Sequence, residues 1–175
     1  IFNFALLGCG RIAMRHADLL GTGQIKGAQL TAVCDIRRER AEEFGAKYGV
    51  PAFQSIDEML TSPNIDVVSV LTPSGMHAEH AITVARARRH VVVEKPMALN
   101  KADGEKVIFE ALRANKQVFC VMQNRYSPPS VWMKELIQSG VLGKIYMVNI
   151  DLFWNRDDRY YKKGGWKGTS DLDGG

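Results

Sequence analysis

Residues 1–121 alternate short, uninterrupted apolar runs with amphipathic stretches. Such runs are typical of strands that are buried on both faces of a parallel sheet. They predict strands at residues 4–7, 30–34, 50–53, 66–71, 91–93 and 118–121. Apolar residues at helical spacing predict intervening helices at residues 12–20, 37–48, 77–89 and 101–115, with a short one from Ser55. This alternation predicts a doubly wound parallel α/β sheet.

The pattern changes after about residue 123. Pro128 and Pro129 open a predicted helix that runs to about Ser139. Residues 144–154 then alternate apolar and polar side chains, which predicts a half-exposed strand of an antiparallel sheet. Residues 155–175 are predicted to be a polar, glycine-rich loop. We therefore expect one domain over residues 1–123 and the beginning of a second over residues 124–175.

The predicted strand at residues 144–154 has one face that nothing else in the sequence covers. An open sheet edge with an uncovered apolar face favours association. We therefore expect the intact protein to be longer by at least ~100 residues, the scale of a domain. We also expect it to self-associate through this face.

Composition narrows the possible partners. The 175 residues are 46% hydrophobic and 24% charged, as in ordinary globular proteins. The net charge of +4 comes from scattered basic residues, which suits an anionic ligand but forms no patch for nucleic acid. The three cysteines form no CxxC pair, and no apolar run approaches the ~20 residues of a membrane span. We expect a cytoplasmic protein without nucleic acid, membrane or metal as a partner.

A glycine motif follows the first predicted strand. Gly8 permits a tight turn, Gly10 leaves room for a pyrophosphate beside the backbone, and Ala13 allows close helix packing. The helix that begins near Arg11 would direct free N–H groups at the phosphates. The two glycines alone could also be a simple turn. The second strand, however, ends in Asp35, a little over the ~20 residues downstream at which an acid binds the ribose hydroxyls. Together these features predict a dinucleotide site.

Ligands of open α/β sheets bind beyond the carboxyl ends of the strands. The candidate binding residues therefore follow the strands, and they are Gly8, Gly10, Arg11, Ile12, Asp35, Leu71, Thr72, Pro73, Glu94, Lys95, Asn124 and Arg125. His77, at the start of the next helix, has either a role in the site or a place on the helix surface.

Simpler alternatives exist for several of these residues. Thr72-Pro73 could only terminate a strand, and Asn124-Arg125 could simply lead into the next helix. Glu94-Lys95 could be a solvated ion pair, worth only ~0–1 kcal/mol. However, both charged residues follow directly after an apolar strand, at the edge of the sheet where ligands bind. Pro96 also restricts the Lys95 backbone to extended geometry.

Several segments carry a resemblance to a known family. They are Gly8-Cys-Gly-Arg-Ile-Ala13, Thr72-Pro-Ser-Gly-Met-His77, Glu94-Lys-Pro96, and Gly165-Trp-Lys-Gly168 with Asp173-Gly-Gly175. Together they resemble the glucose-fructose oxidoreductase, inositol dehydrogenase and rhizopine-catabolism (Gfo/Idh/MocA) family over essentially the whole chain. The segment Tyr160–Thr169, with Gln123–Arg125, is similar to the subgroup that oxidises UDP-N-acetylglucosaminuronate at C3.

The resemblance implies an N-terminal Rossmann domain, an α+β domain with a mostly antiparallel sheet, and an active site between them. It implies that the pyrophosphate is held by Gly8, Gly10, Arg11 and Ile12. It assigns the ribose to Asp35 and the lining of the cofactor to Leu71, Thr72, Pro73 and His77. It places Glu94 near the nicotinamide ribose and Lys95 against the substrate. The nicotinamide end would be bordered by Asn124, Arg125, Trp166 and Lys167, where the family often has arginine at the last of these positions.

These features predict an NAD-dependent oxidoreductase that oxidises a hydroxyl of a sugar or a UDP-sugar, with Lys95 as the proton-transfer residue. Asp35 favours NAD over NADP because its carboxylate would meet the 2′-phosphate, although Arg37 and Arg38 could accept that phosphate. One alternative is a glycosidase of the same family that uses NAD without net turnover. Another is a catalytically silent dinucleotide-binding regulator. We expect a homo-oligomer, either a dimer or a tetramer.

Overall fold

The computed structural model describes residues 1–174 and divides the chain into two compact units. The first unit comprises Ile1–Val121 and the segment from Gly168 onward, and the second comprises Met122–Lys167. The sequence prediction placed the division at residue 123, beside this boundary, and assigned everything after it to the second part. In the structure, the segment from Gly168 onward belongs to the first unit.

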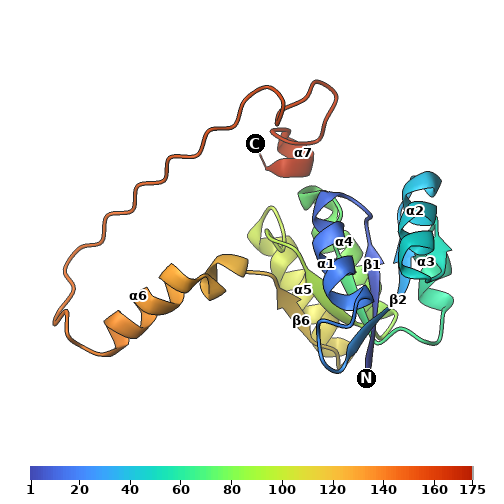
Figure 1. The fold of residues 1–175 in the computed structure, drawn as a ribbon, viewed down its shortest axis with the longest axis horizontal. Coiled ribbons are helices and arrows are strands. Elements are labelled where there is room, and N and C mark those ends of the chain that lie inside the picture. Colours follow the sequence, from blue (N-terminus) through green and yellow to red (C-terminus); the bar gives the residue numbers. More distant parts are fainter. Residues whose placement is uncertain (175) are drawn as a thin grey trace. The chain divides into compact units, whose positions relative to one another are not determined.

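A parallel sheet forms the centre of the first unit (Figure 1). It has six strands. Its strand order is β3-β2-β1-β4-β5-β6, and every neighbouring pair is parallel. The strands are β1 (Phe2–Leu7), β2 (Ala28–Cys34), β3 (Ala52–Phe53), β4 (Val67–Val70), β5 (His90–Val93) and β6 (Val118–Cys120). This order confirms the predicted doubly wound parallel sheet, with the Pro51-containing run at the edge.

Five helices cover the sheet: α1 (Arg11–Gly21), α2 (Arg38–Tyr48), α3 (Ile56–Thr61), α4 (His77–Arg86) and α5 (Lys101–Arg113). A short 3-10 turn, η1 (Ser74–Met76), precedes α4. One apolar layer joins the sheet to α3, α4 and α5, and the other joins it to α1 and α2. Leu6 and Leu7 lie in opposite layers, which is why the strand runs are apolar without interruption.

The predicted helix at residues 77–89 is shorter in the structure, because α4 ends at Arg86. Two residues later, Arg88 has a left-handed backbone with φ 59°. A right-handed helix cannot continue through that conformation. Asn115 has φ 54° and follows the end of α5 in the same way.

The second unit contains the 3-10 turn η2 (Gln123–Tyr126) and α6 (Pro128–Gln138), which confirms the predicted helix after Pro128. The strand predicted at residues 144–154 is absent: residues 145–157 form neither helix nor strand. A strand needs a neighbour to accept and donate its backbone hydrogen bonds. No strand among the described residues pairs with this segment, and Phe153 is 95% exposed. The antiparallel sheet of the second domain therefore stays a prediction.

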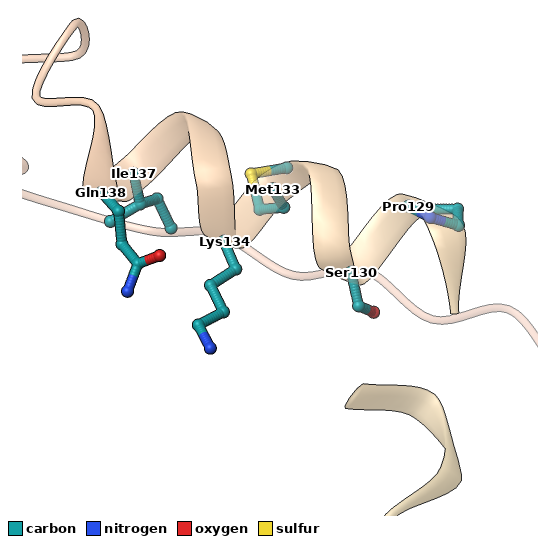
Figure 2. Close-up of a pocket in the computed structure, with 6 residues that line it drawn as sticks. All are labelled: Pro129, Ser130, Met133, Lys134, Ile137 and Gln138. Atoms are coloured by element: carbon teal, nitrogen blue, oxygen red, sulfur yellow. The ribbon is translucent and has the colours of Figure 1, made fainter. Parts of the chain in front are cut away.

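A hollow of about 520 Å³ lies along α6, and Figure 2 shows its lining. One face of the helix supplies that lining: Pro129, Ser130, Met133, Lys134, Ile137 and Gln138. None of the candidate site residues is among them. The hollow is an uncovered helix face rather than a ligand cavity.

Candidate active site

The glycine loop between β1 and α1 requires glycine at its first position. Gly8 has φ +99°, and a Cβ there would lie 2.9 Å from the Leu71 carbonyl oxygen. Gly10 differs, because it has φ −84° and no atom lies within 4 Å of the position a Cβ would take. It is the N-cap of α1, and no side chain caps the free N–H groups there. Open space beside uncapped N–H groups suits a phosphate. Arg11 and Ile12 open the helix with exposed side chains.

Asp35 is buried after β2, and its carboxylate joins two loops. Oδ2 accepts a hydrogen bond from the Cys9 N–H at 2.8 Å, and Oδ1 accepts one from the Arg37 N–H at 2.8 Å. Each carboxylate oxygen keeps a further acceptor site. The side chain is therefore fixed beside the glycine loop and can still accept hydrogen bonds from ribose hydroxyls.

The loop after β4 supplies three candidate residues, Leu71, Thr72 and Pro73. Leu71 is buried, whereas Thr72 and Pro73 are half-buried. The Thr72 hydroxyl lies 2.9 Å from His80 Nδ1, a contact that the sequence analysis did not anticipate. This loop therefore lies against the glycine turn on one side and α4 on the other.

His77 is buried, with 2% of its surface exposed, so the alternative of a residue on the helix surface is wrong. Nε2 lies 2.7 Å from the Thr72 carbonyl oxygen, and Nδ1 lies 2.7 Å from the Pro96 carbonyl oxygen. Both ring nitrogens are thus engaged by the backbone. The ring bridges the loop after β4 and the loop after β5.

Glu94 is buried at the end of β5, and its carboxylate faces helix α1. Oε1 lies 3.2 Å from His16 Nε2, and Oε2 accepts a hydrogen bond from the Lys95 N–H at 3.3 Å. Burial raises the pKa of the Glu94 carboxyl. The His16 hydrogen bond and charge, with the Lys95 N–H and charge, outweigh it, so the pKa lies below its usual value. The carboxylate is therefore held charged.

Lys95 follows with an exposed side chain, and the Lys95–Pro96 peptide bond is cis. No ion pair joins the Glu94 carboxylate to the Lys95 ammonium in the part of the chain that the structure describes. The alternative of a solvated Glu94-Lys95 pair is therefore not what the structure shows.

His16 is a site residue that the sequence analysis missed. It lies on α1, whose buried positions are Ala13, Ala17 and Leu20. Helical spacing puts His16 beside this buried stripe. A polar residue at that position, one turn past the glycine loop, is the signal that could have identified it.

The remaining four candidates, Asn124, Arg125, Trp166 and Lys167, belong to the second unit. Asn124 and Arg125 form part of the exposed turn η2. Lys167 Nζ lies 3.7 Å from the centre of the Tyr160 ring. Their role at the nicotinamide end stays a prediction.

The segment after Lys167 contains a second feature that the sequence analysis missed. Residues 155–175 were expected to be a loop, but Ser170–Asp173 forms the short helix α7. Thr169 caps this helix by accepting a hydrogen bond from the Leu172 N–H. Helix α7 packs on η1, and a Cβ at Gly75 would overlap the backbone oxygen of Asp171. The tail is therefore docked on the loop that precedes α4.

Other reactive groups are not poised for chemistry. Burial is the main cause that raises the pKa of the Cys9 and Cys34 thiols to about 12, and the charge of Asp35 adds to it. Both thiols are therefore protonated and poor nucleophiles. Within residues 1–174, no group of three or more His, Cys, Asp or Glu side chains is arranged to hold a metal ion. The helices in this range are also too short or too polar to cross a membrane.

An oxidoreductase family with an NAD-binding Rossmann fold matches residues 2–122, well over half of the chain. The chain belongs to this family, Gfo/Idh/MocA. This membership confirms the resemblance drawn from the sequence and the prediction of an NAD-binding Rossmann domain.

Two curated family members show how the chain relates to whole proteins. A myo-inositol 2-dehydrogenase of Thermotoga maritima is 34% identical over 149 residues, which are 85% of this chain and 44% of that protein. A D-glucoside 3-dehydrogenase of Escherichia coli is 31% identical over 145 residues, which are 82% of this chain and 41% of that protein. The chain thus spans less than half the length of these relatives.

Solved structures of family members extend the comparison into the second unit. The WlbA dehydrogenase of Bordetella pertussis, in complex with NADH and UDP-GlcNAcA, has a TM-score of 0.92 and 37% identity. The match covers 98% of this chain and 53% of that one. A myo-inositol 2-dehydrogenase of Lactobacillus plantarum has a TM-score of 0.76 and 26% identity, covering 82% of this chain and 43% of that one. The WlbA match therefore includes residues that the inositol dehydrogenase match leaves out.

Proposed function

We propose that this chain is part of an NAD-dependent dehydrogenase that oxidises a hydroxyl of a sugar or nucleotide sugar. One observation carries the proposal: Lys95 follows β5 at the same sheet edge as the glycine loop and Asp35. A side chain able to exchange a proton thus lies in the domain that has the features of a dinucleotide site. A binding module without activity has no need of such a residue.

The glycine loop and Asp35 fit the two charged parts of a dinucleotide. The space beside Gly10 and the uncapped N–H groups of α1 suit the pyrophosphate, with Gly8, Arg11 and Ile12 around it. Asp35 suits the adenosine ribose and disfavours a 2′-phosphate, which supports NAD rather than NADP. The loop after β4 would line the cofactor through Leu71, Thr72, Pro73 and His77.

At the nicotinamide end, NAD when bound supplies the acceptor for hydride. Glu94, held charged by His16 and the Lys95 N–H, would accept a hydrogen bond from the nicotinamide ribose. Lys95 would take the proton of the substrate hydroxyl at its Nζ atom. The second unit would border this end through Asn124, Arg125, Trp166 and Lys167.

We propose UDP-N-acetylglucosaminuronate as the substrate, with other sugars as the alternative. The supporting observation is that the match to WlbA, which is solved with UDP-GlcNAcA, covers 98% of this chain. The match to the Lactobacillus inositol dehydrogenase covers 82%. We also propose that the whole protein is a cytoplasmic homo-oligomer, a dimer or a tetramer. The exposed apolar side chains of the segment at residues 145–154 support association.

The test is an assay of the full-length protein with NAD and a panel of substrates, in which NADH formation is followed by absorbance. We expect NADH to form with UDP-N-acetylglucosaminuronate and not with myo-inositol or glucose 6-phosphate. NADH formation with myo-inositol alone would overturn the choice of substrate. Binding of NAD without NADH formation on any sugar would favour the silent regulator, and release of a free sugar without net NADH would favour the glycosidase.

A further inference from the structure

We propose that docking of the tail segment, residues 168–174, is coupled to NAD binding, because the tail segment holds the loops after β4 and β5 in the arrangement that binds the cofactor. The NAD-binding family matches residues 2–122, so the tail segment lies outside that match although it belongs to the first unit. The inference rests on the proposed role of Leu71, Thr72 and Pro73 in lining the cofactor. It does not depend on which sugar is oxidised or on Lys95.

The tail segment is ordered by hydrogen bonds of its own. The Gly168 N–H donates to the Asp173 carboxylate at 2.6 Å, and the Asp173 N–H donates to the Thr169 carbonyl oxygen at 2.9 Å. The Thr169 hydroxyl accepts a hydrogen bond from the Leu172 N–H and so caps α7. Isolated helices this short are not stable in water. The four-residue helix therefore depends on its packing against the first unit.

The tail segment lies directly against Gly75 of η1. A Cβ on Gly75 would overlap the Asp171 carbonyl oxygen and would lie 2.9 Å from Leu172 Cα. The φ angle of Gly75 is not in the left-handed region, so its backbone conformation would accept other residues. Glycine is therefore required at this position by the docked tail segment and not by the turn itself.

The other end of the tail segment lies against the loop after β5. A Cβ on Gly174 would be 3.3 Å from Leu99 Cδ2, and Leu99 follows Pro96 by three residues. The His77 ring joins the same two loops, because its nitrogens lie 2.7 Å from the carbonyl oxygens of Thr72 and Pro96. The tail segment thus contacts both of the loops that His77 links.

The loop after β4 is held between the tail segment and the glycine loop. On one side Gly8 lies against Leu71, whose carbonyl oxygen would be 2.9 Å from a Cβ on Gly8. On the other side η1 begins at Ser74, which is buried. Only Thr72 and Pro73 separate these two contacts, and the ring of Pro73 fixes its φ angle. A shift of η1 must therefore change the position of the residues that are proposed to line the cofactor.

Thermodynamic linkage makes this coupling reciprocal. If NAD binds best when the tail segment is docked, undocking lowers the fraction of protein that is competent to bind and weakens the apparent affinity by that fraction. By the same linkage, bound NAD must favour the docked tail segment by the same factor. Such coupling factors are typically about 5- to 150-fold.

The direct test is hydrogen exchange of the full-length protein with and without NADH. NADH should slow exchange at residues 71–76 and should also slow it at residues 170–174, by about 5-fold or more. Slower exchange at residues 71–76 alone would overturn the coupling and leave the proposed position of the cofactor intact. Unchanged exchange in both segments would contradict the position of the cofactor as well as the coupling.

Two variants test the coupling in the other direction. Gly75→Ala should displace the tail segment and weaken NADH binding about 5- to 150-fold. Thr169→Ala, which removes the cap of α7 and adds no atom to η1, should weaken binding in the same direction. The controls are Gly104→Ala, whose Cβ would meet atoms only at 3.5 and 3.9 Å, and Thr169→Ser, which keeps a capping oxygen. Both controls should bind NADH as the wild type does.

The NADH affinity separates this role from a purely structural one. Fast exchange at residues 170–174 in Gly75→Ala or Thr169→Ala, with a lowered Tm but unchanged NADH affinity, would overturn the proposal. NADH binding does not require turnover. A protein that oxidises no sugar but shows weaker NADH binding in both variants would therefore count against the proposed dehydrogenase and in favour of the coupling.

Discussion

Gly8 and Gly10 belong to the same loop but have different roles. Gly8 adopts a backbone conformation that L side chains rarely adopt and lies against the Leu71 carbonyl oxygen. Gly10 has ordinary backbone geometry and open space around it. The first glycine is therefore required by the fold, and the second is available to a ligand.

Alanine substitutions should separate these two roles. Gly8→Ala should reduce the free energy of unfolding by about 1–3 kcal/mol, because it adds backbone strain and a close contact. Gly10→Ala should leave the thermal midpoint unchanged but weaken NAD binding, because the methyl group occupies the space for the pyrophosphate. Thermal unfolding and NAD titration of both variants test this. Equal loss of stability in the two variants would contradict the assignment.

Glu94 gives a second prediction at this scale, from its lowered pKa. A carboxyl whose pKa is depressed by folding stabilises the protein above its ordinary pKa of about 4.3, and this contribution is lost as the pH falls through the folded value. Glu94→Gln should therefore be less stable than the wild type at neutral pH, and the difference should shrink below about pH 4.3. The free energies of unfolding of the variant and the wild type, measured at several pH values, test this prediction. The matched control is Glu105→Gln, whose side chain is 65% exposed and pairs with Lys101. A pH-independent difference for Glu94→Gln would contradict the mechanism.

The residues at strand ends were predictable, and their partners were not. Gly8, Asp35, Glu94 and Lys95 follow buried strands, so the sequence places them at one edge of the sheet. The contact from His16 to Glu94 depends on how α1 packs across the sheet, and the contacts of His77 depend on the path of two loops. Sequence spacing does not define either path.

At the element scale, periodicity predicted the strands and helices of the first unit because both faces of its sheet are covered within that unit. It failed at residues 144–154, where alternation alone does not supply a neighbouring strand. It also failed at α7, a helix of four residues that carries no periodic signal. That helix packs on η1, a partner distant in the sequence.

Gly75→Ala tests the docking of α7 on η1. The added Cβ would overlap the backbone of Asp171, so α7 should detach while the sheet stays folded. Hydrogen exchange at residues 170–174 should become faster in this variant. Gly104→Ala is the control, since its Cβ would meet only ordinary contacts at 3.5 and 3.9 Å. Unchanged exchange at α7 in Gly75→Ala would show that the docking is not as described.

At the scale of the whole molecule, the second unit leaves apolar side chains uncovered. Ile150, Leu152 and Phe153 are 84%, 79% and 95% exposed. Large apolar groups in one segment favour association or cover by further chain. This chain also spans only 44% of the Thermotoga relative.

We therefore expect light scattering of the full-length protein to give a dimer or a tetramer. Replacement of Ile150 and Leu152 by serine should shift the measured mass toward that of the monomer, because the substitutions remove apolar surface. The control is replacement of Ile36, an exposed residue of the first unit, by serine. A monomeric wild-type protein would contradict this expectation.

We propose that Lys95 transfers the proton during sugar oxidation, and the turnover of Lys95→Ala tests this role. Positioned acid–base catalysis contributes typically ~10²–10⁴-fold, so kcat with NAD and UDP-N-acetylglucosaminuronate should fall by about that factor. NAD affinity should stay nearly unchanged, because the glycine loop and Asp35 are intact. Lys95→Arg should do little better, since arginine does not deprotonate in proteins. Turnover of Lys95→Ala within a few-fold of the wild type would contradict this role and assign the proton transfer to another residue.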